Sequence, residues 1–453
     1  MRPDVRISEL GPAFYDLVKP ADFPKTILRY RNQKAAETVG INKFSDDDWI
    51  AHFGQFKPLE GNLPEPLALR YHGHQFRHYN PDLGDGRGFL FAQLRDDKNR
   101  LLDLGTKGSG QTPYSRAGDG RLTLLGGVRE VLATSYLEAL GVNTSKSFSL
   151  IETGEQLQRS DEPSPTRSAV LVRLSHSHIR FGTFQRAAFE DNKEGLEALT
   201  SYCLKYYYPD VEDLTPAGLL GAVVRASADT VASWMVAGFV HGVMNTDNMN
   251  ITGESFDYGP YRFSPTLQAG RTAAYFDHQG LYAFGRQPEI MYWNLSHLAG
   301  TLAHISEDKP LLAALEVFPQ HYQKALRDKF FTRLGITPSA ALKNDLDFVM
   351  QSLKWLEASQ AGLAQFYVDF YGGVNSKKSA LKSANKAFYQ GEAFNEWLNS
   401  LKHYEACTRQ SDQPGPVTLN HDDIETLWAP IAEKDDWSMF VAKLHEIGAL
   451  NPE

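Results

Sequence analysis

Hydrophobic residues follow two different periods along this chain, and the change of period divides it into two parts. Short runs typical of β-strands stand at 88–94, 101–104 and 169–174. Between the second and third runs, residues 128–140 have apolar positions at helical spacing, and Gly141 is a typical helix stop. This order predicts a β-rich segment that contains one helix.

Beyond about Ala187 the period becomes mostly helical. Residues 217–244 form one long apolar segment with this period, and 293–302 predict a second helix. From about Pro310 onward, amphipathic helices alternate with polar turns. We therefore expect an α+β fold of two lobes, with a β-rich N-lobe and a mostly helical C-lobe.

The same patterns predict three regions. Residues 1–66 form an N-terminal lead-in, in which 45–50 resembles the capped start of a helix. Residues 67–186 form the N-lobe and include an exposed loop at 158–167, and residues 187–453 form the helical C-lobe.

Composition and charge narrow the classes of function. The chain has 453 residues, of which 42% are hydrophobic and 22% charged, so we expect a soluble globular protein with an ample core. A formal net charge of −9 argues against a general nucleic-acid-binding protein, which usually carries a basic surplus. Cys203 and Cys407 are too few for a disulfide framework. We find no signal peptide and no stretch long and apolar enough to span a bilayer, and we expect a cytoplasmic protein without a membrane partner.

One segment of the helical part has the frame of a kinase catalytic loop. In kinases, H-R-D-x-x-x-x-N supplies a catalytic Asp and a metal-binding Asn, and D-F-G supplies a second metal ligand. Here His241 and Asn248 keep that separation and Asp257-Tyr258-Gly259 replaces D-F-G, but Val243 stands at the position of the base. Together with the order of strands and helix, this motif predicts a bilobal protein-kinase-like fold. Because valine cannot accept a proton, the segment fits either a catalytically silent kinase relative or a nucleotide enzyme with another base.

Asp247 is the carboxylate left inside this loop and is the natural candidate for a replacement base. Asn248 and Asp257 offer hard oxygen ligands, which suit Mg²⁺ or Mn²⁺ on a polyphosphate better than zinc. The alternative explanation of the same residues is a polar turn in which Asp or Asn caps a helix.

Charged residues upstream stand in the right order for a nucleotide site. Lys107 follows the strand at 101–104 and Glu130 lies on the predicted helix, as in kinases, where a strand lysine pairs with a helix glutamate and faces the phosphates. Arg173 and Arg180 offer guanidinium groups that match phosphate geometry, although both also fit ordinary surface charges.

A glycine-rich segment, 84–88, opens the first strand of this region. Glycines such as Gly84 and Gly86 let backbone N–H groups approach phosphate oxygens. Taken alone, the segment equally fits a tight hairpin turn, because it matches neither the kinase glycine loop nor a Walker loop.

In this order the motifs resemble the selenoprotein O family, kinase-like proteins that transfer AMP from ATP to protein hydroxyl groups. The resemblance covers about 71–302. The matching segments are 71–76, 83–87, 107–116, 119–121, 177–182, 241–249, 257–260 and 277–280.

The resemblance implies that ATP binds in the reverse of its kinase orientation, so that its α-phosphate faces a Ser, Thr or Tyr hydroxyl of a protein and pyrophosphate leaves. Asp247 would accept the proton, Glu130 would orient Lys107, and Asn248 and Asp257 would hold Mg²⁺ or Mn²⁺. The residues implied to contact the nucleotide are Gly84, Gly86, Arg87, Lys107, Asp119, Gly120, Arg173, Arg180 and Asp257. A silent nucleotide-binding scaffold and a conventional kinase that transfers the γ-phosphoryl group are the alternatives.

The chain departs from the family pattern at several positions. Arg77 stands where the family usually has glycine, and Pro81-Asp82 replaces its usual Gly-Gln. A cysteine frequent in the family is missing from the region 273–276, and the C-terminal sequence 450–453 lacks the common Cys or selenocysteine. We therefore expect no redox switch between those two positions and a divergent C-terminal region.

Overall fold

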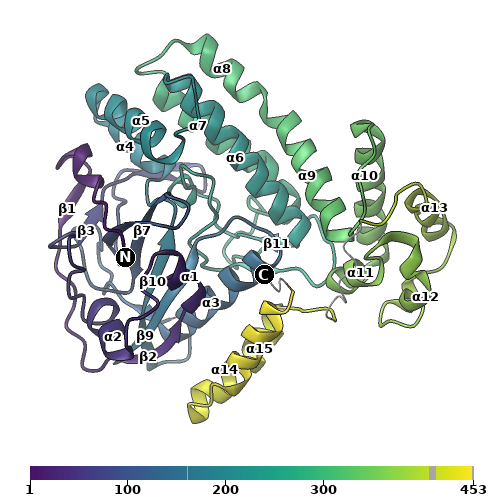
Figure 1. Ribbon diagram of the computed structural model, residues 1–453, viewed down its shortest axis with the longest axis horizontal. Helices are drawn as coiled ribbons and strands as arrows, with labels where there is room; N and C mark the ends of the chain where they lie inside the picture. The colour runs from purple at the N-terminus through teal and green to yellow at the C-terminus, as the bar shows by residue number, and fades with distance from the viewer. Residues whose placement is uncertain (161, 408–414, 451–453) are drawn as a thin grey trace.

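The computed structural model describes residues 1–160, 162–407 and 415–450. A curled, β-rich N-terminal part packs against a helical C-terminal part, which confirms the predicted two-lobed, kinase-like α+β fold (Figure 1). The expected loss of a redox switch rests partly on the missing cysteine at 450–453. Of these residues, 451–453 lie outside the described residues.

An eight-stranded antiparallel sheet forms the framework of the N-lobe. In spatial order its strands are β1 (Tyr15–Leu17), β3 (Leu67–Leu69), β6 (Leu90–Arg95), β7 (Leu101–Lys107), β10 (Thr166–Ser175), β9 (Lys146–Leu157) and β2 (Ile27–Arg31), with β8 (Leu122–Thr123) beside β10. The three predicted strands correspond to β6, β7 and β10. Both edge strands, β1 and β2, come from the predicted lead-in, so this segment completes the sheet.

Strand β9 was not predicted, because its serines and threonines conceal a buried strand. Ser147 and Ser149 are buried, and their hydroxyl groups are used internally. Thr134 Oγ1 donates to Ser147 Oγ at 2.9 Å, and Trp49 Nε1 donates to Ser149 Oγ at 2.8 Å. Small polar residues satisfied in this way are compatible with burial on both faces of a sheet.

Helices cover both faces of the sheet. On one side lie α1 (Gln33–Thr38) and α2 (Asp46–Phe53), whose Trp49 stacks on Phe148 of β9. The predicted capped helix start is confirmed, because Ser45 and Asp48 form a reciprocal capping box. On the other side α3 (Leu124–Ala139) packs against β9 and β10. It begins four residues before the predicted start and ends just before Gly141, which has a left-handed φ of 78°.

The C-lobe is helical, as predicted, and its first helix begins at Phe181, slightly before the expected boundary. Its helices are α4 (Phe181–Phe189), α5 (Lys193–Tyr207), α6 (Pro216–Ala237), α7 (Gln287–Leu302), α8 (Asp308–Glu316), α9 (Phe318–Leu334), α10 (Leu342–Ser359), α11 (Leu363–Asp369), α12 (Lys377–Ala380), α13 (Glu392–Leu401), α14 (His421–Lys434) and α15 (Ser438–Gly448).

Helix α6 corrects two expectations. It ends at Ala237 instead of continuing to 244, because Gly238 caps it in the left-handed conformation with φ 69°. The chain then forms β11 (Phe239–Val240), which pairs with β12 (Arg262–Phe263). The expectation that no stretch is long and apolar enough to span a bilayer is wrong, because α6 meets both criteria by its length and composition. However, 78% of the apolar part of α6 is buried, as expected of a core helix.

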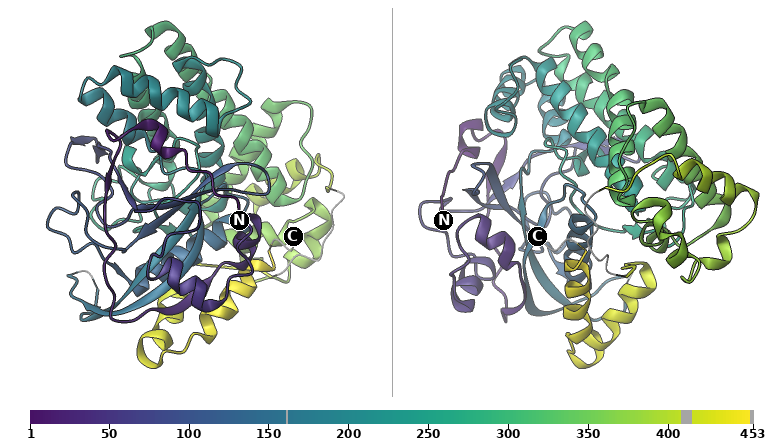
Figure 2. Two further views of the ribbon diagram at one scale, coloured as in Figure 1. Left: turned by 60° about the vertical axis from the view of Figure 1, so that its left-hand side comes forward. Right: turned by 45° about the vertical axis from the view of Figure 1, so that its right-hand side comes forward.

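The C-terminal helices return to the N-lobe. Helices α14 and α15 lie beside α3 and the sheet, away from α10 and α13 (Figures 1 and 2). Asp435 pairs with Arg29 at 2.9 Å and with Arg167 at 2.7 Å, and Tyr136 on α3 donates to Val417 O at 2.6 Å. The end of the chain therefore supports the helix that carries Glu130.

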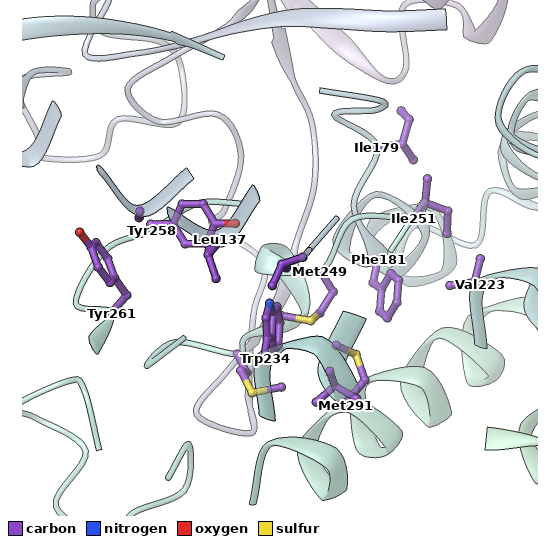
Figure 3. Close-up of a cluster of buried hydrophobic side chains, with 14 of the residues drawn as sticks. Leu137, Ile179, Phe181, Val223, Trp234, Met249, Ile251, Tyr258, Tyr261 and Met291 are labelled. Carbon is purple, nitrogen blue, oxygen red and sulfur yellow. The ribbon is translucent and has the colours of Figure 1, made fainter. Parts of the chain in front are cut away.

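A buried cluster joins the lobes behind the kinase-like loop (Figure 3). Met249 and Tyr258 lie in this cluster close to Trp234 of α6, and Leu137 of α3 reaches it from the N-lobe. Because buried residues flank both Asn248 and Asp257 in sequence, the backbone that carries these side chains is fixed by packing.

Candidate active site

A cavity of about 640 Å³ is lined by residues of both lobes. The predicted site residues that line it are Gly84, Gly86, Arg87, Lys107, Asp119, Gly120, Arg173, Arg180, Asp247 and Asp257. Glu130 and Asn248 are not among its lining residues. Glu130 contacts the lining residue Lys107, and Asn248 follows the lining residue Asp247 in sequence. One pocket therefore brings together side chains that are up to about 170 residues apart in sequence.

The structure brings together the lysine and the glutamate that the sequence suggested as a strand–helix pair. Lys107 Nζ contacts Glu130 and lies 2.7 Å from Asp257 Oδ1. Lys107 is 5% exposed and Glu130 is 1% exposed. Strand β7 carries the lysine and α3 the glutamate, so the packing of this helix on the sheet fixes the direction of the ammonium group.

Asp257 is surrounded by three positive charges. Besides Lys107, Arg173 approaches it at 3.5 Å and Arg180 at 3.4 Å. Burial acts to raise the pKa of Asp257, but these three charges hold that pKa well below its ordinary value. Asp257 also has a left-handed φ of 65°, a conformation that non-glycine residues adopt mainly where the surrounding structure imposes it. Its carboxylate thus lies where negatively charged phosphates would meet the same three cations.

The two arginines are buried and held in different ways. Arg180 donates to Asp247 O at 2.9 Å and lies over the ring of Tyr71 at 4.6 Å. Arg173 is 3% exposed, and its Nε and Nη1 atoms have no hydrogen-bond partner among the described residues. Nη1 is the atom that approaches Asp257 at 3.5 Å, so Nε is the group without a partner in the described part of the chain. A buried guanidinium group of this kind beside a cavity is suited to bind an anion.

Asp247 lies in a short 3₁₀ turn, Thr246–Asn248, and faces the cavity. It is 7% exposed, and its Oδ1 atom has no hydrogen-bond partner among the described residues. Burial raises the pKa of Asp247 to about 7, although the positive charge of Arg180 opposes this effect. A carboxylate with a pKa near neutrality is suited to accept a proton at physiological pH.

Residues that sequence reasoning missed hold this turn in place. Asn245 Oδ1 accepts a hydrogen bond from Tyr282 Oη at 2.7 Å, and Asp277 accepts hydrogen bonds from the backbone N–H groups of Leu281 and Tyr282, both at 2.8 Å. Thr246 Oγ1 accepts from the backbone N–H of residue 74 at 2.7 Å. The matched segment 277–280 was the signal for this support, because Asp277 positions Tyr282 and Tyr282 positions the loop.

The predicted metal ligands fit a hard cation. Asn248 donates through Nδ2 to Val243 O at 3.0 Å, which leaves its Oδ1 atom available as a ligand. Asp257 would supply the second oxygen ligand. No group of three or more His, Cys, Asp or Glu side chains arranged to hold a metal occurs within residues 1–160, 162–407 and 415–450. Two protein oxygens are what Mg²⁺ typically uses when substrate phosphates and water complete its coordination.

The glycine-rich segment owes its glycines at least partly to packing. A Cβ atom on Gly84 would lie 2.3 Å from the Tyr114 ring, and one on Gly86 would lie 2.8 Å from Tyr114 O. Both glycines therefore let the segment 111–121 close over the cavity. Gly120, within that segment, has φ 70°, and a Cβ there would lie 2.3 Å from the Gly110 backbone.

The predicted loop 158–167 contributes to the site as well. Arg159 lines the cavity and forms two hydrogen bonds to Asp119, at 2.8 and 3.0 Å. Residues 166 and 167 already belong to β10, which shortens this loop. Sequence reasoning missed Arg159, because nothing in its local sequence indicates that the hairpin folds back to Asp119.

Arg77, the departure from glycine, occupies a strained position. It lies with φ 66° at the tip between β4 (Gly73–Gln75) and β5 (His78–Asn80). Glycine adopts this conformation at no steric cost, whereas arginine does not. The guanidinium group lies 5.7 Å from the Trp293 ring, a contact that partly offsets the strain.

Comparison with known proteins agrees with this geometry. The model of the family described as "Protein adenylyltransferase SelO" matches residues 2–448. The protein nucleotidyltransferase YdiU of Synechocystis sp. is 43% identical, with 96% of this chain and 95% of that protein covered. The protein of the same name from Gloeobacter violaceus is 44% identical, with 96% and 92% covered, and that from Trichodesmium erythraeum is 42% identical, with 97% of each covered. With a family match over nearly its whole length and a cavity lined by the family's motifs, the chain belongs to the SelO family of protein adenylyltransferases.

Proposed function

We propose that this protein transfers AMP from ATP to the hydroxyl group of a Ser, Thr or Tyr side chain of a protein and releases pyrophosphate. The observation that carries the proposal is the position of Asp247. This carboxylate lines the cavity beside Arg180, whereas Val243, at the position of the kinase base, does not line it. The loop therefore presents its proton acceptor four residues later than a kinase does.

The reaction requires a proton acceptor and compensation of phosphate charge. In our proposal the acceptor oxygen attacks the α-phosphorus, its proton passes to Asp247, and the bond from the α-phosphorus to the bridging oxygen of the β-phosphate breaks. Lys107, Arg173 and Arg180 form the positive side of the cavity and stabilise the charge on the departing pyrophosphate. Glu130 keeps the Lys107 ammonium in place.

Further contacts to ATP are assigned to the cavity wall. Gly84, Gly86 and Arg87 would contact the nucleotide from the glycine-rich segment, and Asp119 and Gly120 from the segment 111–121 that packs against it. Asn248 and Asp257 would hold Mg²⁺ or Mn²⁺, which when bound neutralises phosphate charge and helps to orient the leaving group.

The place of action follows from cysteine usage. Cys203 is buried and free, and Cys407 is exposed and free. Free thiols are typical of proteins in reducing compartments, so we propose that this protein acts on protein substrates in the cytoplasm.

The deciding experiment measures whether the α-phosphate or the γ-phosphate of ATP is transferred to protein. The purified protein is incubated with Mg²⁺ or Mn²⁺, a protein extract and ATP labelled on either the α- or the γ-phosphate, and labelled protein is detected after denaturing electrophoresis. We expect α-label and no γ-label on protein, together with stoichiometric pyrophosphate. Protein that carries only γ-label would show a conventional kinase instead, and tight ATP binding without either label would show a silent scaffold.

A further inference from the structure

The segment 111–121 forms one wall of the cavity and is tied to the glycine-rich segment. Ser115 Oγ donates to Gly86 O at 2.5 Å, and Thr112 Oγ1 donates to Asp85 O at 2.5 Å. Within the segment, Ser115 Oγ also accepts a hydrogen bond from Thr112 N at 2.8 Å. The backbone on the N-terminal side of Arg116 is therefore fixed relative to the glycine-rich segment 84–88.

Arg116 itself adopts a left-handed backbone conformation, with φ 52°. For a residue with a Cβ atom, this conformation is sterically unfavourable. Strain of this kind persists where the surrounding structure imposes it, and it is concentrated at functional sites.

Arg116, like Arg87, differs in its pairing from the other four arginines that line the cavity. Arg121 is paired with Glu155 at 2.8 Å and Arg159 with Asp119 at 2.8 Å. Arg173 and Arg180 both approach Asp257, at 3.5 and 3.4 Å. Within the described part of the chain Arg116 has neither an ion pair nor a side-chain hydrogen bond, although it lines the cavity. Its exposed guanidinium group is thus free to bind an anion.

The charge of Arg116 also acts on the proton acceptor. Arg116, Arg180 and Asp247 all line the same cavity, and both arginine charges act on the Asp247 carboxylate. Arg180 donates a hydrogen bond to the backbone of this turn, whereas Arg116 reaches the cavity from the segment 111–121. A group that reacts beside Asp247 therefore lies in the positive field of both arginines.

We propose that Arg116 is a further catalytic residue, which contacts the non-bridging oxygens of the α-phosphate during AMP transfer. The inference rests on the proposed function, in which the α-phosphate lies beside Asp247. As the acceptor oxygen bonds to phosphorus and the bond to pyrophosphate breaks, the guanidinium group stabilises negative charge on the transferred phosphate. The acceptor proton passes to Asp247 and the electron pair of the broken bond leaves with pyrophosphate, so Arg116 is not consumed.

The test compares Arg116→Gln and Arg116→Lys with the wild-type protein. The matched control is Arg225→Gln, which removes an exposed arginine of α6 that does not line the cavity. Transfer of α-label is measured under single-turnover conditions at saturating ATP, and ATP affinity is measured separately by calorimetry. Thermal unfolding shows whether each variant is folded.

We expect Arg116→Gln to lower the transfer rate about 100-fold, as for the loss of one transition-state donor, with ATP affinity changed less than about threefold. Arg116→Lys should retain more activity than Arg116→Gln, added guanidinium ion should partly restore Arg116→Gln, and the control should match wild type. A transfer rate for Arg116→Gln within about twofold of wild type overturns the inference, as does a loss fully explained by weaker ATP binding. Absence of α-label with the wild-type protein would instead refute the proposed function.

Discussion

Replacement of Glu254 by glutamine is expected to stabilise the protein at pH 8 but not at pH 4.5. Glu254 lies between Asn248 and Asp257 in sequence and accepts a hydrogen bond from His176 N at 2.9 Å. This contact holds the turn that leads from β10 to Arg180. Burial raises the pKa of Glu254 to about 7, against the opposing effects of the His176 N–H and of the Lys146 charge.

The direction of the pH dependence of stability follows from proton linkage. Between the unfolded pKa of 4.5 and the folded pKa of about 7, the folded protein binds more protons at Glu254 than the unfolded chain does, so stability falls as pH rises through this range. At pH 8 the ionised carboxylate therefore costs about 3 kcal/mol, because each pH unit of difference is about 1.4 kcal/mol. Glutamine retains an acceptor for the His176 N–H but carries no charge.

The assay is the thermal unfolding temperature of both proteins from pH 4.5 to 8. For 453 residues the unfolding entropy is about 1 kcal/mol/K, so removal of this cost should raise the unfolding temperature by about 3 °C at pH 8. The difference between the two proteins should shrink as pH falls and disappear near pH 4.5. An equal difference at both ends of the range would refute the reasoning, because it would show that Glu254 does not titrate between them.

Three further substitutions test the site and its support. Asp247→Asn should lower the AMP-transfer rate by about 10²- to 10⁴-fold, the usual contribution of a general base, with ATP affinity unchanged in calorimetry; a near-normal rate would exclude Asp247 as the proton acceptor. Asp257→Ala should abolish α-label transfer, because it removes a metal ligand and the anion shared by three cations, and full activity would contradict the metal assignment. Asp435→Ala should lower the free energy of unfolding by about 1 kcal/mol at neutral pH, since Asp435 joins Arg29 and Arg167 but is about half exposed and screened by solvent; unchanged urea denaturation would show that these ion pairs do not hold α14 on the N-lobe.

Much of the site could be predicted from the sequence because many of its residues belong to short motifs with fixed spacing. The loop from His241 to Asn248 and the triplet at Asp257 have fixed local spacing, and Val243 indicated that a proton acceptor would have to lie at another position. Local signals also fixed element boundaries, as Ser45 did for α2 and Gly141 for α3. Such signals depend on residues three or four positions apart, which the sequence shows directly.

Other features arise only from contacts between distant segments. Strand β9 has too many hydroxyl residues to be recognised, and its burial depends on partners such as Trp49, 100 residues away. The role of Gly84 is decided by Tyr114 packing over it. Arg116 contrasts with Arg121 and Arg159, which are paired with Glu155 and Asp119.

By itself, the sequence determined the order of the β-rich and helical parts, the resemblance to the family and many of the residues that line the cavity. Only the tertiary structure decided that Asp257 gathers three cations, that Arg116 stays unpaired, and that α14 and α15 return to support α3. The physical reason is the separation in sequence over which each interaction acts. Periodicity and capping act between near neighbours, whereas the ion pair of Arg29 with Asp435 joins residues 406 positions apart and forms only when the whole chain has folded.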